Sequence, residues 1–295
     1  MLTKKYILQA LMKARADGYV NQDVRNNDFA SFIHTQCESK EKLLKKRDAE
    51  IVKCHAKGWI DHVQGEEDEV TFIYSLHIQS LIKQRELFYI EEEIEKRQAL
   101  FYKDTLLKDE AILLRDDSAT RSNLSIDVQG ENRAFTYNRL GAVQYAEKWW
   151  NTYNPKYKTF EVNCTNYVSQ CLHAGGAPMR GQPNRAKGWW TNNNVWSYSW
   201  TVANSMYWYL KGSKAGLCAQ EKSAANELVP GDIICYDFEG DGRWNHTTIV
   251  VAKDANAMPL VNANTYNSRM RYWAYEDSTA YTPNIKYAFF HIVDR

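Results

Sequence analysis

The stretch from Asn163 to Gly176 constrains the fold of this chain most strongly. It reads Asn-Cys-Thr-Asn-Tyr-Val-Ser-Gln-Cys-Leu-His-Ala-Gly-Gly. Asn163 is a favoured N-cap, apolar residues follow at helical spacing, and the glycine pair supplies a left-handed stop, so we expect a short helix with Cys164 in its first turn. First-turn N–H groups and the helix dipole favour thiolate over thiol there. Cys171, two turns on among apolar neighbours, is expected to be an ordinary buried thiol.

Composition excludes several classes of protein. The chain has 295 residues and a net charge of +1, with charges of both signs mixed, so nothing argues for a nucleic-acid partner. The lysine-rich segment 40–46 is interpreted as a solvated helix face. No apolar run reaches the length of a signal peptide core or a membrane span, and the six cysteines lack the spacing of a disulfide scaffold or zinc site, so we expect a cytoplasmic protein with reduced thiols. Oligomeric state is left open.

The pattern of the chain predicts two domains. Residues 1–114 are expected to form an α+β module of unknown role, helical to about residue 60, with a strand from Val70. Residues 87–102 fit a long strand or a helix, and we favour the strand. Residues 115–134 are polar and aperiodic, and are expected to be a linker. Residues 135–295 are expected to form the second domain.

The second domain begins with helical patterns and ends with strand patterns. Helices are expected from Tyr137 to about Tyr153, at Cys164, and up to Leu210. Strands are expected at 233–237, 244–251 and 260–265, the first two as a hairpin. A helix that bears a cysteine, followed by antiparallel strands, gives an α+β fold, and this order resembles the arrangement of papain-like hydrolases.

A thiolate nucleophile needs a base and an orienting acceptor for that base. Of the seven histidines, His246 begins a strand after a glycine-containing loop and is the best-placed base. Asn262 and Asn264 share a face of the next strand, and an asparagine oxygen there could hold the imidazole tautomer. The alternative from spacing alone is a set of unrelated polar residues in strands and turns.

From about Tyr137 onward the sequence resembles the bacterial putative amidase domain family, a branch of the papain-like cysteine peptidases and amidases. The motifs that carry the resemblance are Tyr137-Asn138-Arg139, Ala142 to Ala146, Asn163 to Cys171, Gly188-Trp189-Trp190, Ser197 to Trp200, Gly231-Asp232 and His246-Thr247. The resemblance implies a hydrolase that cleaves peptide-like or peptidoglycan-derived amides without a metal or cofactor. It assigns Cys164 as the nucleophile and His246 as the base. Two positions depart from the pattern, where Asn163 replaces an aspartate and Asn264 a histidine.

Further candidates concern the oxyanion and the substrate. Asn166 and Tyr157 are candidate oxyanion donors beside the backbone N–H of Cys164. Nine of the ten tryptophans lie beyond residue 148, and they are either core residues or the lining of a substrate cleft. The candidates for a cleft are Trp189, Trp190, Trp200 and Trp244. The alternative function is a non-catalytic module that binds a peptide or glycan through this aromatic surface.

Overall fold

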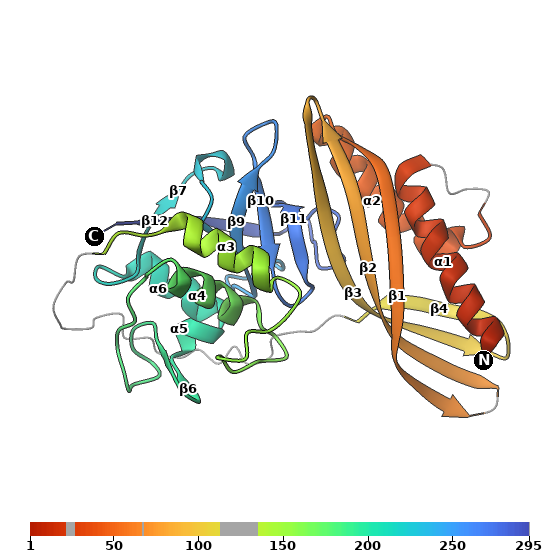
Figure 1. Cartoon of the computed structure of the whole chain (residues 1–295), viewed down its shortest axis with the longest axis horizontal. Coiled ribbons are helices and arrows are strands. Elements are labelled where there is room, and N and C mark those ends of the chain that lie inside the picture. The colour runs from red at the N-terminus through yellow and green to blue at the C-terminus, as the bar shows by residue number, and fades with distance from the viewer. Residues whose placement is uncertain (22–26, 67, 113–134, 295) are drawn as a thin grey trace. The chain divides into compact units, whose positions relative to one another are not determined.

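The computed structural model describes residues 1–21, 27–66, 68–112 and 135–294 (Figure 1). The chain divides into two compact units, one made of residues 1–113 together with 275–279, the other of residues 114–274 and 280–295. The linker expected at 115–134 lies outside the described residues. In the described part of the chain, no helix has the length and apolarity that a membrane crossing requires.

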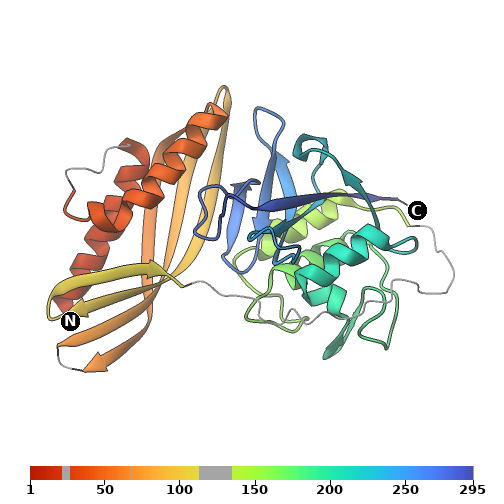
Figure 2. The same cartoon turned by 180° about the vertical axis from the view of Figure 1, so that it is seen from behind.

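The first unit packs two helices against an antiparallel sheet of long strands (Figures 1 and 2). Strands β1, β2 and β3 follow one another across this sheet, and β4 pairs with β3. Its elements are α1 (Leu2–Asn21), α2 (Ala30–Arg47), β1 (Glu50–Glu66), β2 (Glu69–Gln84), β3 (Leu87–Tyr102) and β4 (Thr105–Ala111).

Alternation along β2 explains how this sheet meets its helices. Phe72, Tyr74 and Leu76 are buried, whereas the residues between them are partly exposed, as a half-buried strand requires. The strands expected at 70–78 and 87–102 are therefore confirmed. The helical expectation up to residue 60 is wrong beyond α2, because Asp48 adopts a left-handed conformation (φ 55°) that ends the helix, and β1 begins two residues later.

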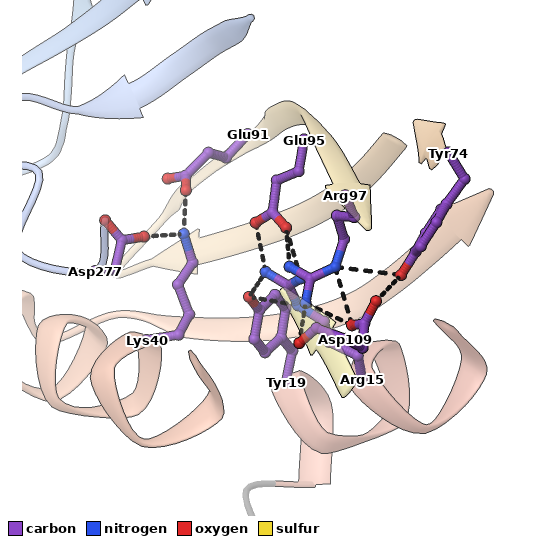
Figure 3. Close-up of polar contacts among 9 residues, drawn as sticks. All are labelled: Arg15, Tyr19, Lys40, Tyr74, Glu91, Glu95, Arg97, Asp109 and Asp277. Atoms are coloured by element: carbon purple, nitrogen blue, oxygen red, sulfur yellow. Dashed lines mark hydrogen bonds and ion pairs between the residues drawn. The ribbon is translucent and has the colours of Figure 1, made fainter. Parts of the chain in front are cut away.

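Charged side chains are buried between the helices and the sheet of this unit (Figure 3). Arg15 on α1 donates to both oxygens of Glu95 on β3, at 2.8 and 2.6 Å. Arg97 donates to Glu95 and to Asp109 on β4, which also accepts the Tyr74 hydroxyl. Positive and negative groups alternate, so the buried charges are compensated.

The second unit places helices on one face of an antiparallel sheet with the order β11-β10-β9-β8-β12-β7 (Figure 1). Its helices are α3 (Arg139–Trp149), α4 (Cys164–Ala174), α5 (Tyr198–Thr201), α6 (Ala203–Gly212) and the 3-10 turn η1 (Ala225–Glu227). The sheet consists of β7 (Cys218–Lys222), β8 (Ile233–Asp237), β9 (His246–Lys253), β10 (Pro259–Ala263), β11 (Ser268–Tyr272) and β12 (Lys286–Val293). A separate hairpin joins β5 (Thr191–Asn192) to β6 (Val195–Trp196).

The described part of the chain is thus a mixed α and β structure with mostly antiparallel strands, and α4 packs on β9 and β10. The hairpin expected from residues 233–251 is confirmed, with Cys235 opposite Thr247 and Tyr236 opposite His246. The helix expected at Cys164 is also confirmed. It ends at Ala174, and of the glycine pair it is Gly176 that takes the left-handed conformation (φ 89°).

Candidate active site

Cys164 is the first residue of α4 and is buried, with a side chain 2% exposed. Asn163 occupies the N-cap position, but its side chain does not cap the helix. Its Oδ1 accepts instead from the backbone N–H of Phe160 and from Nδ2 of Asn166. The capping role expected for this side chain is therefore wrong, because its oxygen is used to shape the segment that leads into the helix.

A hydroxyl pair joins the start of α4 to the start of β9. Oγ1 of Thr165 and Oγ1 of Thr247 lie 3.0 Å apart, and both residues are fully buried. Sγ of Cys164 lies 3.8 Å from the same Thr165 hydroxyl. This pair brings the residue after Cys164 against the residue after His246, so the two candidate catalytic residues belong to segments that touch.

The ring of His246 lies among aromatic side chains. Its centroid is 5.5 Å from that of Tyr236 and 5.9 Å from that of Phe238, with the Phe238 ring stacked. Because side chains alternate along a strand, His246 and Tyr236 lie on the opposite sheet face from Thr247. Burial, and to a lesser degree the positive charge of Arg271, lower the pKa of His246 to about 3.

Asn264 follows the end of β10 and is fully buried. Its Oδ1 accepts from Nδ2 of Asn163 at 2.9 Å. Its Nδ2 donates to the carbonyl oxygens of Trp149, Trp150 and Thr152, each at 3.2 Å. The orienting acceptor role expected for Asn264 finds no support in these bonds, which run to the C-terminal end of α3 and the start of α4. Asn262, on the same face, donates to Glu147 and is likewise engaged.

Of the two expected oxyanion donors, Asn166 is used structurally. Its Nδ2 donates to the carbonyl of Lys158 and to Asn163, and its Oδ1 accepts from the indole of Trp200. Because both ends of this amide are engaged, the oxyanion role is not supported for Asn166. Tyr157 is half-buried, and its ring stacks with that of Trp200 at a centroid distance of 6.1 Å. Burial raises the pKa of its phenol.

The tryptophans divide into core and surface residues. Trp189, Trp190 and Trp200 are at most 1% exposed. Each indole N–H has a protein acceptor, respectively the Ser169 hydroxyl, backbone carbonyls and Asn166. The three are therefore core residues in this structure, which is the first of the two interpretations given for them. Trp244 is half-buried and stacks on Tyr207 at 4.1 Å.

Two residues that were not among the predicted site residues, Thr265 and Asp232, hold the segments around the site in place. Thr265 accepts the backbone N–H of Asn163 through Oγ1, and it does so from a positive φ of 83°. Asp232 is fully buried and accepts from Arg139, from His291 and from two backbone N–H groups. Glycine would have signalled a turn at position 265; threonine gives no such signal.

The described residues include no group of three or more histidine, cysteine, aspartate or glutamate side chains arranged to hold a metal ion. The first carboxylate of the acidic loop after β8, that of Asp237, is hydrogen-bonded within the loop. Asp237 accepts from the backbone N–H groups of Gly240, Asp241 and Gly242. This is the bonding of a tight turn closed by its own side chain.

Comparison with known proteins identifies a family that this chain matches. Residues 136–290 match the model of the family described as "Putative amidase domain". The chain belongs to this family. It is also 54% identical to the uncharacterized protein YhbB of Bacillus subtilis (strain 168), over 98% of this chain and 96% of that protein. The uncharacterized protein YjcM of the same organism is 27% identical over 40% of this chain and 28% of its own length.

No solved structure matches the chain. The match to the amidase domain runs from just before α3 into β12, and it includes the candidate residues Cys164, His246 and Asn264. The description of the family indicates a hydrolase of amides. The resemblance seen in the sequence to the amidase domain family is thereby confirmed.

Proposed function

We propose that the second unit is a cysteine-dependent amide hydrolase of papain-like type, with Cys164 as nucleophile and His246 as base. The observation that carries the proposal is the hydroxyl pair of Thr165 and Thr247, which joins the two segments that hold these residues. The position of Cys164 at the first residue of an 11-residue helix supports it, because aligned N–H groups favour a thiolate there.

The proposed reaction begins with transfer of the thiol proton of Cys164 to His246. The thiolate then attacks the carbonyl carbon of the amide, and the imidazolium protonates the departing amine. Water attacks the resulting thioester and releases the acid and the thiol. His246 enters this cycle neutral, since its lowered pKa keeps the imidazole unprotonated above about pH 3.

Because His246 lies on the sheet face opposite Thr247, the proposal requires its side chain to turn about the first residue of β9 in order to reach Sγ of Cys164. Among substrates, we propose peptide-like or peptidoglycan-derived amides. Tyr157 and the half-buried Trp244 are the aromatic candidates that remain for contact with such a substrate.

Hydrolysis of a mixed panel of peptide amides and muropeptides tests the proposal. Wild type should release amine, and Cys164→Ala should abolish the release. Cys171→Ala is the matched control, since Cys171 lies on the same helix, is buried, and has a pKa raised by burial. Equal loss of activity in both variants, or full activity in Cys164→Ala, would refute the role of Cys164.

One observation favours a second candidate, a non-catalytic binding module. The His246 ring lies beside Tyr236 and Phe238, and its low pKa makes it a weak base. A binding module should retain a peptide or glycan ligand unchanged in Cys164→Ala, with no turnover in wild type. Equilibrium dialysis with the same panel separates the two candidates.

A further inference from the structure

We propose that the turn between β10 and β11 is a clamp that positions Cys164 through the residue before it. This proposal rests on the proposed function, since it assigns positioning residues to the nucleophile of that reaction. The clamp consists of Asn264 and Thr265, which both bind Asn163. Neither is assigned contact with a substrate.

The clamp holds Asn163 at two points. Oγ1 of Thr265 accepts the backbone N–H of Asn163, and Oδ1 of Asn264 accepts Nδ2 of the same residue at 2.9 Å. All three residues are buried, between 0 and 6% exposed. Two bonds to one residue fix both its backbone and its side chain, and Asn163 is bonded covalently to Cys164.

The clamp is anchored to a third element. Nδ2 of Asn264 donates to the carbonyl oxygens of Trp149, Trp150 and Thr152, where α3 ends. Carbonyl groups at a helix C-terminus lack intrahelical donors, so Asn264 satisfies them while its oxygen faces Asn163. The end of α3 and the start of α4 therefore meet through one amide.

Backbone strain supports a positioning role for this turn. Thr265 has a φ of 83°, and the β-branched side chain makes such a conformation unfavourable. Tyr266 follows at 51°. Strained backbone of this kind persists where surrounding contacts determine it, and it concentrates at functional sites. From this conformation Oγ1 of Thr265 accepts the N–H of Asn163, and the backbone N–H of Thr265 donates to Oδ1 of Asn267.

The clamp has a chemical consequence for the thiol. Asn163 is held by the turn, and its side-chain oxygen binds the Phe160 N–H and Asn166 rather than capping α4. A helix start held in this way keeps the N–H dipoles aligned beside Sγ, which favours the thiolate. Loss of a bond between the clamp and Asn163 should therefore reduce the fraction of Cys164 that is present as thiolate at a given pH. A change in solvent access alone should leave this fraction unchanged.

The test is the pH dependence of Cys164 alkylation by iodoacetamide, followed by mass spectrometry of the modified peptide. Thr265→Val keeps the shape of the side chain and removes the acceptor, and Thr265→Ser keeps the hydroxyl. We expect the midpoint of the pH–rate profile to rise by about 0.7 pH unit in Thr265→Val. This shift is a fivefold change in the ionisation equilibrium of the thiol, and it corresponds to the net contribution of about one hydrogen bond. Thr265→Ser should retain the wild-type midpoint.

Two further variants test the second contact of the clamp and its specificity. Asn264→Ala should shift the midpoint in the same direction as Thr265→Val. Asn262→Ala is the matched control, because Asn262 is buried on the same face two residues away and binds Glu147 and the Met270 N–H instead. If Asn264→Ala does not fold, Thr265→Val decides the question.

The clamp is overturned if Thr265→Val keeps the wild-type midpoint, if only the pH-independent rate changes, or if Asn262→Ala shifts the midpoint equally. Alkylation needs no turnover, so the result is separate from the proposed function. Shifts in the clamp variants together with unaltered hydrolysis in Cys164→Ala would support the clamp and refute the role of Cys164 as nucleophile.

Discussion

Neutral amide side chains, rather than charged ones, surround the start of α4. Asn163, Asn166 and Asn264 each donate and accept at once, so one side chain can connect two segments. An amide carries no net charge, and burying it costs little once its hydrogen bonds are made. This network holds the segment before Cys164 without placing a fixed charge beside the thiol.

The buried imidazole of His246 should make stability depend on pH. Its pKa is about 3 in the folded chain, against about 6.5 when exposed in the unfolded chain. Between these values the unfolded chain binds the extra proton, so stability is lost as the pH falls through this window, by about 1.4 kcal/mol per pH unit. Urea denaturation at pH 7, 5.5 and 4.5 measures the slope.

His246→Gln removes this titration, and its slope below pH 6.5 should be smaller than that of wild type by the same amount. Other groups titrate in this range, so the difference between the two proteins is the informative quantity. Equal slopes would contradict a buried neutral His246.

At the scale of elements, Asp232 fastens the ends of the second unit together. Oδ1 accepts from Arg139 at the start of α3 and from the N–H of Ile292 on β12, and Oδ2 accepts from His291 on β12. The Arg139 guanidinium also donates to the carbonyl of Ile292. We call this set of bonds among Arg139, Asp232, His291 and Ile292 the clasp. It explains structurally why the motifs Asn138-Arg139 and Gly231-Asp232, which lie far apart in the sequence, occur together.

Removal of the Asp232 carboxylate should destabilise the second unit strongly. The side chain is fully buried, and Asp232→Ala leaves Arg139 without this carboxylate partner. We expect the free energy of unfolding to fall by about 3–5 kcal/mol. Asp241→Ala in the exposed turn after β8 is the control and should cost less than ~0.5 kcal/mol. Tryptophan fluorescence during urea denaturation reports this unit. A cost below about 1 kcal/mol for Asp232→Ala would contradict the clasp.

The sequence predicted the elements whose patterns are regular. Alternation at Val70 to Ile78 and the signals at Asn163 and Gly176 located β2 and α4, because burial on one face produces such patterns. It did not predict β1, in which most residues are exposed and charged residues interrupt the period. It also did not predict the partners of Asn264, which are the Asn163 side chain and backbone carbonyls at and just beyond the end of α3, because no residue type reveals such contacts.

At the scale of the whole molecule, the first unit includes a segment that is distant in the sequence. Residues 275–279 belong to this unit, and Asp277 binds Lys40 at 2.8 Å beside Glu91 (Figure 3). The side chains of all three are about 4–5% exposed. The neighbouring Glu276 binds Lys46, whose side chain is 63% exposed.

These adjacent acids provide a matched pair of variants. Asp277→Ala should cost about 3–5 kcal/mol, because it removes one partner from a buried ion pair. Glu276→Ala should cost less than about 1 kcal/mol, because water screens the pair with exposed Lys46. Amide hydrogen exchange in peptides from α2 and β3 measures both. Similar loss of protection in the two variants would contradict the distinction.

The central claim, that Cys164 forms a thioester during amide hydrolysis, is tested most directly by trapping that intermediate. Wild type mixed with a slowly cleaved amide, quenched in acid and digested, should carry the acyl mass on the peptide with Cys164. Cys171→Ala should carry it at the same place, and Cys164→Ala should carry none and release no amine. Amine release without an adduct in wild type, or continued release in Cys164→Ala, would contradict the mechanism.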